Sequence, residues 1–263
     1  MSKKSNIQWT EATWNPIRGC SRVSEGCRFC YAEYISARFS GKGKPYEGLA
    51  MMTAKGPRWT GKIALIDKVI ERPLQWKEPK LIFVNSMSDM FHEEVPSDYI
   101  QQLFEVMRSA YWHEFQILTK RSERLMEMSP DIDWPDNVWM GVSVEDQKNT
   151  FRIDHLRGTQ ANIKFVSAEP LIGPINDMDL MNIDWCIVGG ESGPKARPMN
   201  LNWVVNIISA CEEWNTDIFV KQMGARWAKA NWCKDSKGGD MMEWPDYLRI
   251  REYPERKEMF LGQ

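Results

Sequence analysis

The 263-residue sequence lacks several features that would place it in a special class. No apolar run approaches the ~20 residues that a membrane-spanning helix needs, so we expect no membrane segment. No apolar segment follows the polar start, which predicts a cytoplasmic rather than a secreted protein. Six cysteines are too few for a disulfide scaffold in a chain of this length. Because repeats, low-complexity tracts and linkers rich in Pro, Gly or Ser are also missing, we expect a single domain over residues 1–263.

Charge and cysteine are distributed unevenly. Residues 1–60 contain ten Lys/Arg and four Asp/Glu, a net charge of +6, whereas residues 61–263 have a net charge of −8. The same basic segment holds Cys20, Cys27 and Cys30. A positive surrounding favours thiolates and attracts anions. The alternative is a basic surface that is simply solvated.

Short apolar runs alternate with amphipathic segments from residue 80 onward. The runs are rich in β-branched and aromatic residues, which is typical of strands buried on both faces. They predict strands over 81–84, 115–118, 138–142, 163–166, 185–188 and 217–220. This alternation predicts an α/β fold, a partial or full (β/α) TIM-like barrel with parallel strands. Residues 41–60 and 224–263 have the least regular pattern, and we expect them to cover the site.

Three amphipathic segments predict helices with one buried face each. The predicted buried residues are Ala32, Ile35 and Phe39 in 29–40, Ile100, Leu103, Phe104, Met107 and Tyr111 in 97–112, and Val204, Ile207, Ile208 and Cys211 in 201–213. Ser97 is the expected N-cap of the second helix. Cys186, Cys211, Trp139 and Trp185 are expected in the core, whereas Trp59, Trp227, Trp232 and Trp244 are expected to line a pocket or an interface.

Polar residues follow all six predicted strands, at 85–89, 119–121, 143–146, 167–170, 189–193 and 221–222. In a parallel fold these strand ends share one face, where ligands bind. The sequence therefore predicts the wall of an active site there, with Asn85, Ser86, Lys120, Ser143, Glu169 and Glu191 as candidates. More ordinary roles also remain: Ser86, Thr119 and Ser143 could cap helices, Lys120 and Arg121 could form surface ion pairs, and Glu169-Pro170 could be a structural turn.

Three interpretations of the Cys20-x6-Cys27-x2-Cys30 loop compete. The first is a structural zinc site, which needs four ligands. The loop supplies three cysteines, and His92 and Cys233 remain as possible fourth ligands. Three unrelated buried thiols are the second interpretation. The third is a [4Fe–4S] cluster that three thiolates hold, which leaves one iron open for a ligand.

The cysteine loop also carries a resemblance. The segment Thr13-Trp14-Asn15-Pro16, followed by Gly19-Cys20 and by Gly26-Cys27-Arg28-Phe29-Cys30-Tyr31-Ala32-Glu33, resembles a family of phage and bacterial proteins of unassigned function that is regarded as radical-SAM-like. The resemblance continues through 83–89, 118–121, 141–145, 167–171 and 188–194. Radical SAM enzymes typically carry Cys-x3-Cys-x-aromatic-Cys. This sequence keeps the second half but has six residues between its first two cysteines.

The resemblance implies a radical SAM enzyme. Cys20, Cys27 and Cys30 would ligate three irons of a [4Fe–4S] cluster, and S-adenosylmethionine (SAM) would chelate the fourth. Lys120 would bind the SAM carboxylate, with Asn85, Ser86 and Ser143 as partners of its amino group and ribose. Glu169 and Glu191 are the candidate catalytic residues. An electron donor such as flavodoxin or ferredoxin is implied, and the substrate class stays open between a nucleotide or nucleic acid, a peptide and a small metabolite.

Two further functions remain open. Glu169 and Glu191 end neighbouring predicted strands and would suit acid and base roles in a hydrolase. Alternatively, the basic first 60 residues, with Trp14, Tyr31 and Tyr34 available for stacking, would suit a zinc-stapled nucleic-acid-binding module.

Overall fold

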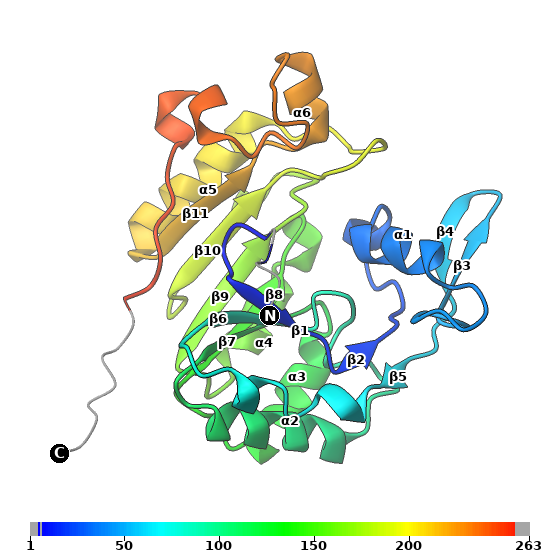
Figure 1. Ribbon diagram of the computed structural model, residues 1–263. Helices are drawn as coiled ribbons and strands as arrows, with labels where there is room; N and C mark the ends of the chain where they lie inside the picture. The colour runs from blue at the N-terminus through cyan, green and yellow to red at the C-terminus, as the bar shows by residue number, and fades with distance from the viewer. Residues whose placement is uncertain (1–4, 6, 256–263) are drawn as a thin grey trace.

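The computed structural model describes Ser5 and residues 7–255, and in this part of the chain the α/β prediction is confirmed. Seven strands of the described residues form one all-parallel sheet in the order β1-β6-β7-β8-β9-β10-β11. The sheet curls without closing, which is the architecture of a partial TIM-like barrel (Figure 1).

The bounds of the elements are as follows. The parallel strands are β1 (Ala12–Trp14), β6 (Leu81–Val84), β7 (Glu114–Thr119), β8 (Val138–Ser143), β9 (Ile163–Ala168), β10 (Trp185–Gly189) and β11 (Asp217–Gln222). Two antiparallel pairs are formed by β2 (Ile17–Arg18) with β5 (Ala64–Leu65) and by β3 (Ala50–Thr53) with β4 (Gly56–Trp59). The helices are α1 (Tyr31–Arg38), α2 (Ser97–Ser109), α3 (Ser122–Met128), α4 (Phe151–Arg157), α5 (Leu201–Trp214) and α6 (Ala225–Ala230), joined in part by short 3₁₀ turns such as η1 (Glu25–Cys27).

All six predicted strands are present within one or two residues of their predicted ends. The sequence did not predict β1, because its three residues lie between polar Glu11 and Asn15 and carry no recognisable period. In the structure β1 pairs with β6, with Ala12 opposite Ile82. The first strand of the sheet is therefore fixed by its partner strand rather than by its own sequence.

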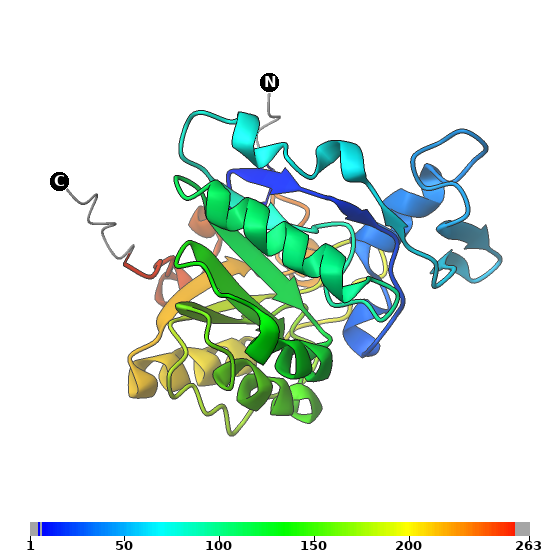
Figure 2. The same ribbon diagram turned by 90° about the horizontal axis from the view of Figure 1, so that it is seen from below.

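The sheet has an apolar layer on each face, because successive side chains of a strand point to opposite sides. On the outer face Ile82 and Val84 of β6 belong to a core shared with helices α2 to α5 (Figure 2). On the inner face Leu81 and Phe83 belong to a second cluster that is mainly aromatic: Trp9, Leu81, Phe83, Trp139, Ile163, Phe165, Trp185, Ile187 and Phe219. The rings of Trp9 and Phe83 lie 4.6 Å apart. Large rings thus fill the interior of the open barrel.

The predicted helix faces are confirmed in part. The buried residues of α5 are the predicted ones. In α2 the predicted Ile100, Leu103, Phe104 and Met107 are buried, and so are Tyr99 and Val106, which were not predicted. The prediction that Tyr111 is buried was wrong, because α2 ends at Ser109 and the Tyr111 side chain is 54% exposed. Pro96, not Ser97, is the N-cap of α2.

The predicted face of α1 was also wrong for two of its three residues. Ala32 is buried, but Ile35 and Phe39 are exposed. The helix instead buries Glu33, which forms an ion pair with Arg22 and accepts a hydrogen bond of 2.8 Å from the backbone N–H of Trp59 in β4. Because α1 packs against a small hairpin rather than the main sheet, a buried carboxylate takes the place of an apolar stripe.

The two segments expected to be irregular contain regular structure. Residues 41–60 include the β3–β4 hairpin, and residues 224–255 include α6 and two 3₁₀ turns; residues 256–263 lie outside the described part. Trp244, expected in a pocket, is 2% exposed and belongs to the core, whereas Trp139 and Trp185 are buried as predicted. In the described residues no helix is long and apolar enough to cross a membrane.

Candidate functional site

The three-cysteine loop lies against the carboxyl ends of the parallel strands. Beyond β7, Arg121 Nη2 donates hydrogen bonds to the carbonyl and the hydroxyl of Ser21, at 3.2 and 2.7 Å. Beyond β8, the side chain of Glu145 accepts a 2.6 Å hydrogen bond from Ser24 Oγ. The structure therefore brings the cysteine loop to the edge where parallel α/β folds bind ligands.

A short 3₁₀ turn sets the spacing of the last two cysteines. Cys27 ends η1, and Cys30 directly precedes α1, with the Cys30 N–H donating to the Cys27 carbonyl at 3.4 Å. A β-carbon at Gly26 would lie 2.4 Å from Oε1 of Glu145. Only glycine lets the loop approach this carboxylate so closely.

The three thiols are unbridged and affect one another electrostatically. Burial and the charge of Asp89, opposed by Arg121, together raise the pKa of Cys20 to about 12. Burial also raises the pKa of Cys30, and the charge on Cys27 adds to the effect at both positions. Cys20 and Cys30 would have to lose their protons on binding a metal, because the thiolate is the ligand.

Glu145 is a buried carboxylate that joins the loop to two cations. Its side chain is 0% exposed and pairs with Lys120 at 3.3 Å and with Arg152 at 2.9 Å. Burial raises its pKa, but Lys120, Arg152 and the Ser24 hydroxyl together hold the pKa below its usual value. For Lys120, burial lowers the pKa, and the charges of Glu145 and Cys27 raise it above its usual value overall. Lys120 therefore lies near Cys27, paired with a buried carboxylate and not on the open surface.

Arg121 and Asp89 form a second charged pair beside Cys20. The Arg121 guanidinium contacts Asp89 at 3.1 Å and Glu93 at 2.9 Å, and its Nη1 lies 3.9 Å from Cys20 Sγ. Asp89 also accepts a 2.7 Å hydrogen bond from Thr119 Oγ1. The positive charge next to Cys20 is thus held in place from the ends of β6 and β7.

The candidate SAM ligands are placed at the same edge, and none of them caps a helix. Asn85 has φ of 58° and accepts a hydrogen bond from the Ile17 N–H at 3.3 Å, while its buried Nδ2 has no hydrogen-bond partner among the described residues. Ser86 Oγ donates to Asn15 Oδ1 at 3.1 Å. Ser143 is buried at the end of β8.

Glu169 and Glu191 follow the neighbouring strands β9 and β10, as the sequence predicts. Each carboxylate already pairs with a cation: Glu169 with Lys221 at 2.6 Å and Glu191 with Arg197 at 2.6 Å. Glu169 and Pro170 form a turn directly after β9, so the structural-turn interpretation also holds. Both acid side chains are consequently engaged within the chain.

Arg197 extends the site from Glu191 to the cysteine loop. Its Nη2 donates to the Glu25 carbonyl at 3.1 Å, and its guanidinium lies 5.4 Å from the centre of the Phe29 ring. The loop is therefore held from the ends of β7, β8 and β10.

The proposed fourth zinc ligands are not set up for that role. His92 accepts from the Glu94 N–H at Nδ1 and contacts Ser21 Oγ at Nε2, so both ring nitrogens are engaged. Cys233 lies in the turn after α6 and interacts with Glu243. Within the described residues no three side chains of His, Cys, Asp or Glu converge as a site for a single ion.

The expectation that Trp14 is available for stacking was wrong. Trp14 is 1% exposed, and its indole N–H donates to the Val69 carbonyl at 2.8 Å. Tyr31 and Tyr34 remain about half exposed on α1. Trp14 was misjudged because it belongs to β1, which the sequence did not predict.

Several site residues were not singled out from the sequence, namely Ser24, Asp89, Glu145, Arg152, Arg197 and Lys221. Three of them, Asp89, Glu145 and Lys221, lie in the polar stretches that follow predicted strands. The expectation that such stretches form the site therefore included them, although it did not single them out. Ser24, Arg152 and Arg197 lie elsewhere, and nothing in their local sequence distinguishes them from ordinary surface residues.

The fold and the site define a mixed α/β protein, a parallel partial barrel with a three-cysteine loop at the carboxyl ends of its strands. Residues 4–248 match the family described as "Protein of unknown function (DUF5131)", and the chain belongs to that family. Comparison with curated proteins gives no match, and neither does comparison with solved structures.

Proposed function

We propose that the chain is a radical SAM enzyme in which Cys20, Cys27 and Cys30 hold a [4Fe–4S] cluster. The observation that carries this proposal is the position of the three-cysteine loop at the carboxyl edge of a parallel partial barrel. Three thiolates leave one iron of such a cluster open for a further ligand. At this edge the ligand would meet the side chains that end the strands.

The donor set suits a cluster better than a single ion. The three thiols influence one another, yet no three ligand side chains of the described residues meet at one point. Thiolates that hold a cluster bind different irons, so their sulfur atoms need not converge. Arg121 beside Cys20 and Lys120 near Cys27 offset the negative charge that three thiolates would bring.

The chain's own residues would bind and orient SAM. Lys120 has three N–H donors, and its pairing with Glu145 leaves capacity for a carboxylate. The buried Nδ2 of Asn85 is a donor without a partner among the described residues, and a buried donor of this kind favours a ligand acceptor. Ser86 and Ser143 add hydroxyl groups at the ends of β6 and β8.

The cofactors would carry the reaction itself. When bound, the cluster and SAM would supply one-electron reduction and hydrogen-atom abstraction, and the chain's own residues would bind and orient them. An electron donor such as flavodoxin or ferredoxin would provide that electron. Glu169 and Glu191, held by Lys221 and Arg197, would contact the substrate from β9 and β10.

Anaerobic purification tests the proposal. We expect a brown protein with broad absorption near ~400 nm after reconstitution with iron and sulfide. With reductant and SAM it should form 5′-deoxyadenosine. Cys27→Ala should lose both the absorption and this product, because only two ligands remain.

Cys233→Ala is the matched control, because Cys233 is a partly exposed thiol outside the loop; it should keep the cluster. A protein that stays colourless after reconstitution would contradict the proposal. Stoichiometric zinc in aerobic and anaerobic preparations alike would favour a zinc-stapled module instead.

A further inference from the structure

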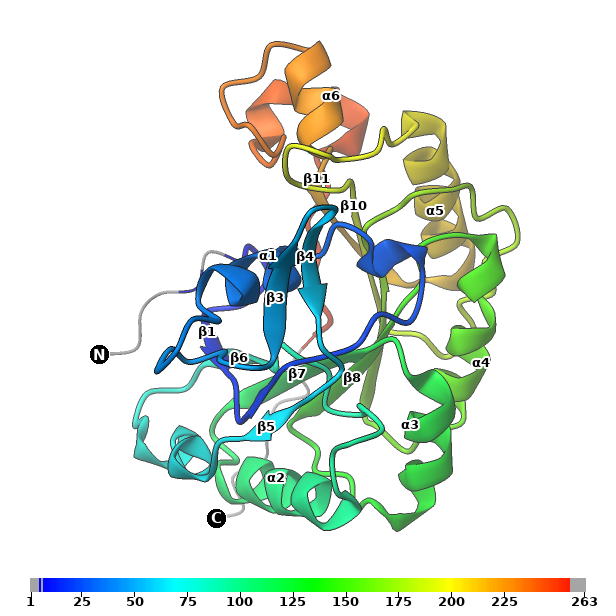
Figure 3. The same cartoon turned by 90° about the vertical axis from the view of Figure 1, so that its right-hand side faces the viewer.

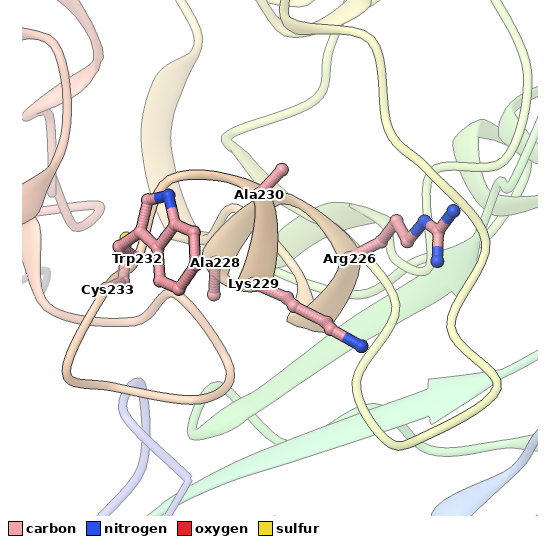
Figure 4. A pocket seen from close by; sticks show the side chains of 6 residues that line it. All are labelled: Arg226, Ala228, Lys229, Ala230, Trp232 and Cys233. Atoms are coloured by element: carbon pink, nitrogen blue, oxygen red, sulfur yellow. The ribbon is translucent and has the colours of Figure 1, made fainter.

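The turn after β11 carries a pocket that the proposed function does not use. We call residues 225–233 the α6 turn. A cavity of about 590 Å³ opens on it (Figure 4), lined by Arg226, Ala228, Lys229, Ala230, Trp232 and Cys233. Its lining combines two cationic side chains with a tryptophan.

Trp232 is held in solvent. Its side chain is 93% exposed, and its backbone has φ of 58°, in the left-handed region. The flanking hydrogen bonds, Asn231 N–H to Trp227 O at 3.0 Å and Cys233 N–H to Ala228 O at 3.0 Å, fix the turn on both sides of it. Tryptophan is usually well buried, so a ring presented this way is available to a partner.

Arg226 and Lys229 supply unpaired positive charge. Both are exposed, and neither takes part in an ion pair with a described residue. Their spacing of three residues places them on the same side of α6. Residues 225–238 contain four Lys/Arg and one Asp, although residues 61–263 as a whole are net negative.

The nearby acidic side chains are turned to the backbone. Asp235 accepts hydrogen bonds from the N–H groups of Lys237 and Gly239, at 3.0 and 2.8 Å. Glu243 accepts from the Lys234 N–H at 2.6 Å. These carboxylates therefore neutralise neither cation of the α6 turn.

From these observations we propose that the α6 turn binds a single-stranded nucleic acid, with Trp232 stacking on a base and with Arg226 and Lys229 contacting phosphates. Aromatic rings for stacking, combined with cations that follow the backbone, are how proteins bind single strands without reading sequence. An acidic peptide would use the two cations but would leave the open face of the indole without a matched partner.

The α6 turn is placed so that a nucleic-acid strand bound to it could continue toward the candidate site. α6 starts where β11 ends, and the Ala225 N–H donates to the Glu191 carbonyl at 2.9 Å. In Figure 3 α6 lies at the top, beyond β11, and α1 and the β3–β4 hairpin, which belong to the basic first 60 residues, lie below it in the view. This inference goes beyond the proposed function and does not depend on the cluster.

Fluorescence anisotropy with a short labelled single strand of mixed sequence, as DNA and as RNA, tests the proposal on the full-length chain. We expect Trp232→Ala to weaken binding roughly tenfold, since stacking is worth about 1–3 kcal/mol per base. Arg226→Ala/Lys229→Ala should lower the slope of log K against log salt by about 1.4, because each phosphate contact on a single strand contributes about 0.7.

Matched controls separate the pocket from general effects. Trp214→Ala removes a partly exposed tryptophan at the end of α5, and Lys68→Ala/Lys148→Ala removes two exposed lysines elsewhere; both variants should bind like the parent. Equal loss in Trp214→Ala and Trp232→Ala would overturn the proposal, as would displacement of the strand by poly-glutamate as effective as by unlabelled strand. Binding that persists in Cys27→Ala is also expected, so failure of the cluster and failure of this pocket are distinguishable.

Discussion

Glu145 shows how one residue holds the candidate site together. It connects Ser24 of the cysteine loop, Lys120 after β7 and Arg152 of α4, and it leaves room for the loop only because residue 26 is glycine. A buried carboxylate is costly unless it is paired and hydrogen-bonded. Here two cations and a hydroxyl meet that requirement.

Glu145→Gln should destabilise the protein by about 3 kcal/mol, because Lys120 and Arg152 would lose their buried counter-charge. The pKa of Glu145 lies below its usual value of 4.5, so its stabilising contribution is complete above that value and is lost as the pH falls through the folded-state pKa. The free energy of unfolding of Glu145→Gln should therefore change less with pH below about 5 than that of the parent protein. Urea unfolding at several pH values measures both effects.

Asp246→Asn serves as the control for this prediction. Asp246 pairs with Arg249 at 2.7 Å but is 90% exposed, so the change should cost less than about 1 kcal/mol. If Glu145→Gln cost no more than this control, Glu145 would not anchor the loop.

At the scale of elements, the inner aromatic layer fixes how closely β8 and β9 pack. Gly141 of β8 faces the ring of Phe165 in β9, and a β-carbon there would lie 2.4 Å from two ring atoms. The ring fills the space that a side chain at residue 141 would occupy. Glycine in the middle of β8 is thus a packing requirement of the open barrel.

Gly141→Ala should lower the free energy of unfolding by about 1–3 kcal/mol through overpacking. The double variant Gly141→Ala/Phe165→Leu should lose less free energy of unfolding than the two single variants lose together. The smaller leucine side chain at residue 165 would leave space for the added methyl group. Denaturant unfolding of the four proteins gives the coupling. Gly158→Ala, where no atom is nearer than 3.5 Å, should change stability little; additive effects at residues 141 and 165 would contradict the packing explanation.

The elements also show where prediction from sequence works. The six short apolar runs were found because a strand buried on both faces leaves a continuous apolar signal. The α5 face was found because Val204, Ile207, Ile208 and Cys211 repeat at helical spacing. β1 was missed because three residues are too few for a period, and the α1 face was missed because Glu33 is buried through polar contacts.

At the scale of the whole molecule, the edge of the open sheet at β11 is covered by a later segment of the chain. The β11 edge is covered by residues 250–252: the Val220 N–H donates to the Ile250 carbonyl at 2.9 Å, and the Glu252 N–H donates to the Ile218 carbonyl at 2.8 Å. The Glu252 carbonyl also accepts from the Trp185 indole at 2.9 Å. A barrel that does not close needs such a cover, because an exposed strand edge is a template for aggregation.

A chain that ends at Arg249 keeps the buried Trp244 and Leu248 but lacks residues 250–252, so it should melt at a lower temperature and self-associate. A chain that ends at Glu255 retains the cover of β11 and should behave as the parent does. Size-exclusion chromatography and thermal unfolding distinguish the two. A monomeric, equally stable chain ending at Arg249 would show that the β11 edge needs no cover.

The sequence by itself determined the parallel α/β fold, the strand ends and the cysteine loop, because each of these produces a pattern among residues that are close together in the chain. Only the tertiary structure decided which polar groups meet at the site. Ser24 and Glu145 are 121 positions apart, and Arg197 reaches the Glu25 carbonyl across 172 positions. Contacts at such separations arise from the curl of the sheet and leave no local pattern, so the partners of the site became visible only once the sheet had placed them at one edge.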